Sequence, residues 1–369
     1  MHNDMLKTRT WAQIDLKNLE YNYNFLKSKL EDKCQILGIV KANAYGHGCE
    51  KIAQKLSQLG VGIFAVACLD EAVKLRENGV LGDILIFGSV PDIDLDIVEK
   101  HNISLTINSL EYAKWLSLSG KKIKAHIKID SGMSRHGFCA DDCAGEVEKV
   151  LKMENLQICG IYTHLSQADD LSETAKKYTQ LQLDTFWSVI DKLKPLDSNI
   201  KLHICNSAGT VLGLSQGCDF ARPGIALYGL APSTELTSYC DLKPVMSLKT
   251  RVSLVKDIKQ GRFVGYGQNF QAKENMKIAI LPVGYADGYH RTLSGKAQVF
   301  LNGKRADVIG RICMDQTIID VSNIDCKIGD EVELFGQNIP LDEIAEIVGT
   351  ISYELVCSVS NRVPRVYID

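Results

Sequence analysis

No stretch of this 369-residue sequence approaches the ~18 consecutive apolar residues that mark a membrane-spanning helix. Residues 1–7 also lack the apolar core of a signal peptide. The net charge is −3 and the pI is about 6.3, so there is no excess of basic residues to hold nucleic acid. We therefore expect a cytoplasmic protein whose partners are neither a membrane nor a nucleic acid.

The sequence has 12 cysteines but no C-x-x-C pair. The closest two, Cys139 and Cys143, have no pair of histidines nearby, so no zinc site is predicted. Others, such as Cys159 and Cys205, stand in apolar runs, where a thiol behaves as a small hydrophobic group. We expect no bound metal and no disulfide framework, as in a reducing cytoplasm.

Short apolar runs alternate with helical patterns over roughly the first 230 residues. The candidate strands are residues 36–40, 62–66, 84–87, 104–107, 124–129, 158–163, 202–205 and 225–228. A helical stretch between the first two has Ile52, Leu56 and Leu59 on one face. This alternation and this size are typical of a (β/α)8 TIM-type barrel. A doubly wound open sheet is the alternative, because periodicity alone does not distinguish the two.

The pattern changes from about residue 240 onward. Candidate strands there are residues 245–255, 297–301, 305–309 and 331–335, and only residues 342–348 have a helical pattern. Asn302-Gly303, between two of these strands, is a strong signal for a β-hairpin. We therefore predict an α/β fold, with a (β/α)8 TIM-type barrel over residues 1–240 followed by a mainly antiparallel β domain over residues 241–369.

A lysine ends the first predicted strand. The apolar run 36–40 stops at Lys41, and Tyr45 and two glycines follow before a helical pattern begins. This order places one amine at the mouth of an α/β core, where apolar surroundings lower the pKa of a lysine. Such an amine suits a Schiff base with an aldehyde cofactor.

Polar side chains also stand at later strands of the predicted barrel. They are Lys128 and Asp130 at the fifth strand, Arg135 in the loop after it, His164 after the sixth, Asn206 and Ser207 after the seventh, and Arg222 before the eighth. The carboxyl ends of barrel strands meet at one face, where active sites form. We therefore expect these side chains to share one site.

Asn206 and Ser207 open a helix after the seventh predicted strand. The unpaired N–H groups at the start of a helix suit a phosphate, and barrel phosphate sites commonly form near strands seven and eight. Plain N-capping explains the same residues. Taken together with Lys41, Asn206 and Ser207 favour a site in which they both cap the helix and help to bind a phosphate.

The sequence resembles the alanine racemase family in a series of segments that follow the family's order. These are residues 40–48, 129–135, 163–164, 203–208, 222–229, 284–288, 310–316, 351–354 and 362–365. The resemblance extends from about Trp11 to Tyr367, and 284–288 (Gly-Tyr-Ala-Asp-Gly) is among its most specific parts. It implies an isomerase that uses pyridoxal 5′-phosphate (PLP) to interconvert L-alanine and D-alanine and that supplies D-alanine for bacterial peptidoglycan.

The resemblance also implies how the cofactor is held. Lys41 would carry PLP as an aldimine and act as one of two bases, and Arg222 would face the pyridine nitrogen with His164 beside it. A permanently charged guanidinium keeps that nitrogen unprotonated. The implied ligands of the phosphate are Tyr45, Asn206, Ser207, Gly224, Ile225 and Tyr353.

By the same resemblance, the second base is Tyr266, which would reach the barrel of the other subunit in a homodimer with shared active sites. Racemisation needs two bases on opposite faces of Cα. Arg135 would lie near the substrate carboxylate, and Lys128 matches a position that is carbamylated in some members. The pocket for the substrate side chain would be formed by Tyr285, Cys313 and Met314.

Several alternatives stay open. The residues alone favour a strand or hairpin aromatic at Tyr266, and they are also consistent with a buried apolar pair at Cys313-Met314. The substrate could be serine or a broader range of amino acids. A PLP-dependent amino-acid decarboxylase should pair the pyridine nitrogen with a carboxylate, which Arg222 argues against, and a single-barrel PLP-binding regulatory protein would lack the β domain. His136 stands where the family has an apolar residue.

Overall fold

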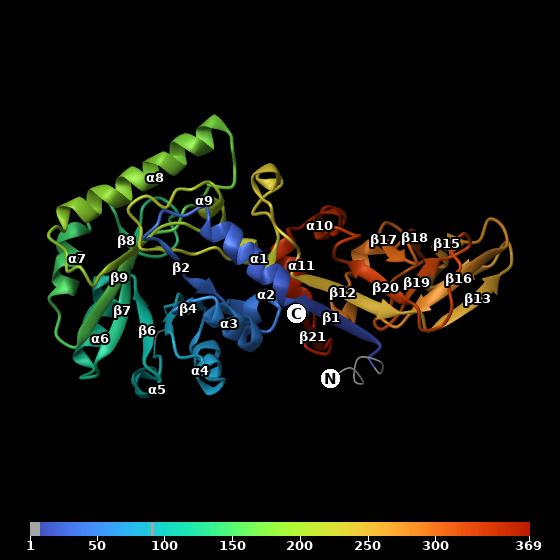
Figure 1. Cartoon of the computed structure of the whole chain (residues 1–369), viewed down its shortest axis with the longest axis horizontal. Helices are drawn as coiled ribbons and strands as arrows, with labels where there is room; N and C mark the ends of the chain where they lie inside the picture. The colour runs from blue at the N-terminus through green and yellow to red at the C-terminus, as the bar shows by residue number, and fades with distance from the viewer. Residues whose placement is uncertain (1–7, 90–91) are drawn as a thin grey trace. The chain divides into compact units, whose positions relative to one another are not determined.

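The computed structural model describes residues 8–89 and 92–369. This part of the chain forms two compact units (Figure 1). The first unit consists of residues 19–44 and 48–243. The second consists of residues 244–369, residues 45–47 and the chain up to Asn18, which includes strand β1 (Thr10–Asp15). None of the described helices is long and apolar enough to cross a lipid bilayer.

The first unit contains a ring of parallel strands. They are β2 (Gln35–Ile36), β3 (Gly38–Ile39), β4 (Ile63–Val66), β5 (Asp83–Ile86), β6 (Ile103–Ile107), β7 (Ile123–Asp130), β9 (Leu156–Tyr162), β10 (Lys201–His203) and β11 (Phe220–Ala221). The order is β2-β11-β10-β9-β7-β6-β5-β4-β3. The short strands β2 and β3 flank Leu37, whose N–H donates to the Ala221 carbonyl (2.9 Å), while the Val40 N–H donates to the Ala65 carbonyl (3.0 Å). Residues 35–40 therefore pair with β11 on one side and with β4 on the other, so the sheet closes into a ring. This closure confirms the TIM-type barrel and excludes the open sheet.

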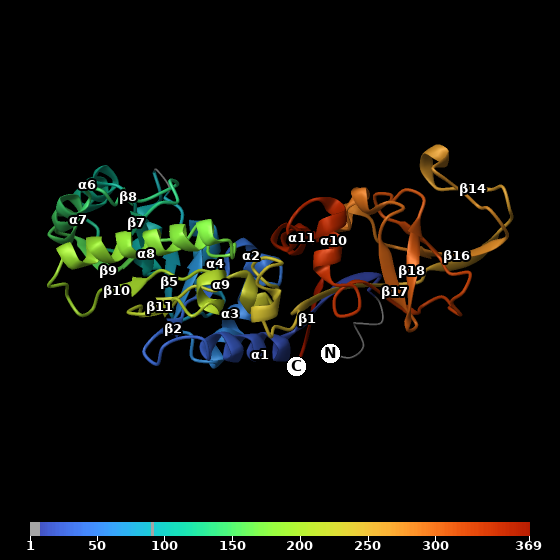
Figure 2. The same ribbon diagram turned by 90° about the horizontal axis from the view of Figure 1, so that it is seen from above.

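Helices alternate with these strands. They are α1 (Leu16–Lys27), α3 (Cys49–Gln58), α4 (Leu69–Glu77), α5 (Leu95–Lys100), α6 (Leu110–Leu118), α7 (Ala144–Leu151), α8 (Glu173–Lys192) and α9 (Ser207–Val211). On α3, Ile52 and Leu56 are fully buried, as their spacing predicts. In Figures 1 and 2 the long α8 lies outside the strands. A short strand, β8 (Phe138–Cys139), pairs with β7 outside the ring.

The prediction of a strand at residues 225–228 is wrong. This segment is the 3₁₀ helix η2 (Ile225–Tyr228), and the last strand of the ring is β11, which pairs with β2. A short apolar run does not reveal its conformation by periodicity, and Pro223 has no N–H to continue a strand ladder. Arg222 therefore follows the last barrel strand instead of preceding it.

The second unit is built on a nine-stranded sheet, in the order β13-β16-β19-β18-β17-β20-β12-β1-β21. Its strands are β12 (Met246–Arg251), β13 (Leu254–Ile258), β16 (Met276–Leu281), β17 (Gln298–Leu301), β18 (Lys304–Ile309), β19 (Thr317–Asp320), β20 (Glu331–Phe335) and β21 (Arg365–Ile368), with β1. Only the pair β1–β21 is parallel. A separate hairpin joins β14 (Phe263–Val264) and β15 (Phe270–Gln271). The mainly antiparallel β domain is confirmed.

Two details of the second unit bear on predictions made from the sequence. The Asn302-Gly303 turn joins β17 and β18 with positive φ at both residues (48° and 81°), which confirms the hairpin. Residues 342–348 are helical as predicted, in α10 (Leu341–Val348), but a second helix, α11 (Ser352–Ser358), was not expected. Its seven residues are too few to show a clear helical period.

Candidate active site

The chain adopts a rare conformation directly after the first strand position of the barrel. Helix α2 (Lys41–Tyr45) is left-handed, with φ of 51° at Ala42, 53° at Asn43 and 54° at Ala44. Residues other than glycine pay about 1–2 kcal/mol each for this conformation. Such strain persists only where the surroundings enforce it, and it concentrates at functional sites. The half-buried Lys41, at the start of this turn, is therefore a candidate residue for such a site.

Two side chains hold this left-handed turn. Glu71 of α4 accepts the N–H groups of Ala42 (2.6 Å) and Ala67 (2.8 Å), which links the turn to the end of β4. Asn43 accepts the N–H of Cys49 (3.0 Å) at the start of α3. Contacts with two neighbouring helices therefore fix the backbone that follows Lys41.

Arg222 connects the carboxyl ends of three neighbouring strands. It follows β11, and its Nη2 donates to the carbonyl of Thr163 after β9 (2.6 Å) and to the carbonyl of Ile204 after β10 (2.9 Å). Its Nη1 lies 3.0 Å from Nδ1 of His203, and Nη2 lies 3.4 Å from Nδ1 of His164. The sequence-predicted neighbours Arg222 and His164 are thus brought together.

The buried charge of Arg222 has no acidic partner among the residues that the structure describes. Burial and then the charge of Arg222 lower the pKa of His164 and of His203 well below the usual value, so both rings are neutral at pH 7. Burial and then Arg222 also lower the pKa of Lys128, on β7, to about 7. This end of the barrel is therefore electropositive and suits a ligand that is anionic or accepts hydrogen bonds.

Asp130 shapes the loop that carries Arg135. Its carboxylate accepts the N–H groups of Gly132 (3.0 Å), Ser134 (3.0 Å) and Arg135 (3.1 Å). Burial acts to raise the pKa of Asp130, but these N–H groups lower it, so the carboxylate stays ionised. The side chains of Arg135 and His136 are exposed.

Helix α8 supports two of the site loops from one face. Tyr178 donates to the carbonyl of Gly132 (2.6 Å). One turn later, the fully buried Gln182 accepts the N–H of Ser166 (2.9 Å) and donates to the carbonyl of His164 (3.2 Å). The loops of Arg135 and His164 are therefore held by the same helix.

The start of α9 meets the start of η2 in a buried cradle. Asn206 caps α9 through its side chain. The Ser207 hydroxyl oxygen accepts the N–H groups of Gly224 (2.8 Å) and Ala226 (3.3 Å), on either side of Ile225. These two bonds occupy both lone pairs of the oxygen, so the hydroxyl proton is left to be donated. The cradle therefore offers the Ser207 hydroxyl proton, a donor of the kind that a phosphate accepts.

In the second unit, Tyr45 and Tyr353 lie against each other. Their ring centroids are 6.2 Å apart and the rings are tilted by 55°. Burial raises the pKa of Tyr45, so its hydroxyl stays protonated and can donate. Arg365 ties this segment to β21 by donating to the carbonyl of Gly46 (2.8 Å).

The second unit also exposes three of the large side chains that the sequence analysis assigned to the site: Tyr266 (70% exposed), Tyr285 (42%) and Met314 (53%). The N–H of Tyr285 donates to the carbonyl of the half-buried Cys313 (3.1 Å). The turn of Tyr266 meets the same segment, because a Cβ at Gly267 would lie 2.9 Å from the Arg311 guanidinium. Exposed apolar side chains gathered in this way indicate a binding surface.

Three buried residues around Arg222 had no role predicted from the sequence. The Tyr162 ring lies 5.3 Å beneath the guanidinium and stacks on His203, with centroids 4.7 Å apart. His126 Nδ1 lies 2.9 Å from His203 Nε2. A signal was present, since His126 stands two residues before Lys128 and alternate strand residues share a face.

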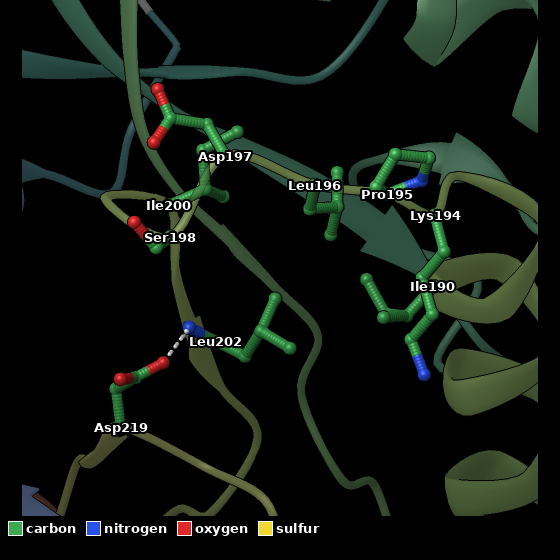
Figure 3. A pocket seen from close by; sticks show the side chains of 9 residues that line it. All are labelled: Ile190, Lys194, Pro195, Leu196, Asp197, Ser198, Ile200, Leu202 and Asp219. Carbon is green, nitrogen blue, oxygen red and sulfur yellow. Dashed lines mark hydrogen bonds between the residues drawn. The ribbon is translucent and has the colours of Figure 1, made fainter.

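A surface hollow of about 590 Å³ lies at the opposite end of the barrel (Figure 3). It is lined by residues 194–198 and by Ile200 and Leu202 near the start of β10. In the same figure the Leu202 N–H donates to Asp219 (2.8 Å). Since barrel active sites form at the carboxyl ends of strands, this hollow is separate from the site of Arg222.

Comparison with known proteins places both units in one family. The family model described as alanine racemase, N-terminal domain, matches residues 14–232, and the model for the C-terminal domain matches residues 245–367. The alanine racemase of Clostridium kluyveri is 42% identical over 370 residues, covering 97% of this chain and 94% of that protein.

Solved structures agree with these matches. The chain is similar to an alanine racemase of Clostridium difficile, with a TM-score of 0.92, 37% identity and coverage of 98% of this chain and 96% of that chain. It is also similar to the alanine racemase of Bacillus anthracis with bound L-Ala-P, with a TM-score of 0.90, 33% identity and coverage of 98% and 95%.

Proposed function

The chain is an enzyme of the alanine racemase family, and from that premise we propose that it interconverts L-alanine and D-alanine with PLP held at the carboxyl end of the barrel. The observation that supports this most is the buried Arg222, whose guanidinium is held by neutral groups in an electropositive site. In a bacterium, the product would serve the synthesis of peptidoglycan.

The residues present fit the chemical groups of PLP. Lys41 supplies an amine for the aldehyde, and the Ser207 hydroxyl, with its proton left to donate, suits the phosphate. A guanidinium has five N–H donors, and Arg222 has three acceptors at 3.0 Å or closer, which leaves donors for the pyridine nitrogen. The remaining phosphate ligands would be Tyr45, Asn206, Gly224, Ile225 and Tyr353.

When bound, PLP supplies the electron sink that makes the Cα–H of alanine acidic. Lys41 Nζ would exchange the proton on one face of Cα, and the phenolic oxygen of Tyr266 of the partner subunit would exchange it on the other. The cationic barrel end favours negative charge, so it would suit an oxygen that accepts a proton from Cα. The active enzyme would therefore be a homodimer with shared sites.

Arg222 would also restrict the chemistry. Its permanent charge in contact with the pyridine nitrogen opposes protonation there, because two adjacent positive charges repel. Arg222 would thereby limit the negative charge that bound PLP can take up, which would favour return of the proton over side reactions. A decarboxylase gains from the opposite arrangement, so Arg222 favours the racemase.

The substrate would be held by two further groups. Arg135 would bind the alanine carboxylate, and Tyr285, Cys313 and Met314 of the partner subunit would enclose the methyl group. A pocket that encloses a methyl rejects a slightly larger side chain only modestly, so slow turnover of serine is expected.

Lys128 would support Arg135 after carbamylation. With its pKa lowered to about 7, a large share of its amine is neutral at pH 7. The neutral amine can attack CO2, forming an N–C bond and losing one proton, and the resulting carbamate is an anion that would pair with an arginine.

One experiment tests the whole proposal. Purified protein is mixed with PLP and scanned for the absorbance of a lysine-bound cofactor, and L-alanine is then added and followed by chiral chromatography. We expect D-alanine to accumulate until the enantiomers are equal. Loss of CO2 from an amino acid, without formation of D-alanine, would instead indicate a decarboxylase.

A further inference from the structure

A chain of three buried side chains runs from Arg222 into the barrel. Arg222 Nη1 lies 3.0 Å from His203 Nδ1, and His203 Nε2 lies 2.9 Å from His126 Nδ1. All three are 4% exposed or less. The two imidazole rings meet nearly edge to face, at 71°.

The chemistry of these three groups determines which nitrogen carries each proton in their hydrogen bonds. A guanidinium has no acceptor, so Nη1 must donate and His203 Nδ1 must carry a lone pair. A neutral imidazole has one N–H, so the proton of His203 is on Nε2, which then donates to His126 Nδ1. His126 in turn carries its proton on Nε2. The order of donation is therefore Arg222 to His203 to His126.

Donation in this order requires the imidazole rings of His203 and His126 to be neutral. The surroundings of both rings keep them neutral. Burial lowers the pKa of His126 to about 4, and burial and then Arg222 lower that of His203 well below the usual value. An imidazolium at either position would present an N–H to another N–H.

The strand beside His126 is shaped to admit its ring. A Cβ at Gly160 of β9 would lie 2.4 Å from His126 Nδ1, which is the nitrogen that faces His203. On its other side, His203 stacks on Tyr162 with an interplanar angle of 8°. Glycine at 160 therefore leaves the acceptor nitrogen room to reach His203, and Tyr162 holds the plane of the second ring.

We propose that His126 is a positioning residue that keeps His203 in its Nε2–H form, so that His203 Nδ1 stays an acceptor and directs the guanidinium of Arg222. Its effect on the reaction rests on the proposed function, because it acts through the face that Arg222 presents to the pyridine nitrogen. Without an acceptor at His126, the buried N–H of His203 has no partner. Moving that proton to Nδ1 would then direct an N–H at Arg222.

The first test needs no cofactor. In the protein without PLP, labelled with ¹⁵N-histidine, NMR should show both rings with Nε2 protonated and Nδ1 unprotonated from pH 5 to 9. A scalar coupling across the hydrogen bond should join His203 Nε2 to His126 Nδ1. A protonated Nδ1 on His203, an imidazolium on either residue, or no coupling between the two would overturn the proposal, and these measurements require no variant.

Two variants at His126 separate the loss of its hydrogen-bond acceptor from the loss of its side-chain volume. His126→Asn places Oδ1 where Nδ1 stood and should keep the Nε2–H form of His203, whereas His126→Phe removes the acceptor and should change the His203 signals. In the enzyme loaded with PLP, His126→Phe should lower kcat roughly tenfold, with little change in KM and a shift in the pH profile of cofactor absorbance, while His126→Asn restores both. Equal behaviour of the two variants would overturn the proposal. An inactive wild type with the expected NMR signals would instead contradict the proposed function alone.

Discussion

Replacing Ser207 by alanine separates phosphate binding from helix packing. The Ser207 oxygen accepts two buried N–H groups, at 2.8 Å from Gly224 and 3.3 Å from Ala226. An unpaired buried donor costs about 1–3 kcal/mol, and the longer of the two bonds contributes less. We therefore expect Ser207→Ala to lower the free energy of unfolding of the protein without PLP by about 2 kcal/mol. It also removes a hydroxyl donor to the phosphate, so PLP should bind ~10-fold more weakly.

The matched control is Ser215→Ala. Ser215 is fully buried in the same barrel and accepts the N–H of Glu31 (3.2 Å), which is not part of the cradle. It should lower stability without changing the affinity for PLP. The assay is a cofactor titration by absorbance with PLP and with pyridoxal, which lacks the phosphate, alongside thermal unfolding. If Ser207→Ala weakened PLP and pyridoxal equally, or weakened neither, the assignment of the phosphate cradle would be refuted.

Three further predictions concern the bases and Lys128. Tyr266→Phe should keep PLP but lose proton transfer on one face, so solvent deuterium enters Cα of one enantiomer far faster than the other; equal loss from both enantiomers would indicate a structural role. Mixing Lys41→Ala with Tyr266→Phe and allowing subunits to exchange should restore about half of normal activity per heterodimer, because one of its two sites would carry neither lesion; no restoration would contradict shared sites. In protein kept free of CO2, Lys128 stays an amine whose pKa is lowered to about 7 in the folded state. Above pH 7 the unfolded state then binds more protons, so stability should rise from pH 7 to about 10 relative to Lys128→Met. Parallel curves for the two proteins would contradict a buried neutral amine.

Much of the fold could be predicted from periodicity. The barrel strands up to β10 and the hairpin at Asn302-Gly303 have clear patterns, and the structure confirms them. Two of the failures came from short segments. The 3₁₀ helix η2 and the helix α11 are four and seven residues long, too short for their hydrophobic spacing to decide between strand and helix.

The candidate site was predictable where polar residues end strands. Lys41, His164, Ser207 and Arg222 all follow strands of the barrel. The left-handed turn after Lys41 could not be predicted, because alanine in α2 carries no preference for positive φ. His126 was passed over because a histidine within an apolar strand resembles a core residue until its neighbour across the barrel, His203, is known.

The most direct test of the central claim is the formation of D-alanine by the protein with and without Lys41. Purified wild type and Lys41→Ala are incubated with PLP and L-alanine, and both enantiomers are measured by chiral chromatography over time. We expect the wild type to bring the enantiomers to a ratio of one, and Lys41→Ala to lose both the covalently held cofactor and nearly all turnover. Racemisation by Lys41→Ala at the wild-type rate, with PLP reducible by borohydride onto another lysine, would contradict the assignment of the site.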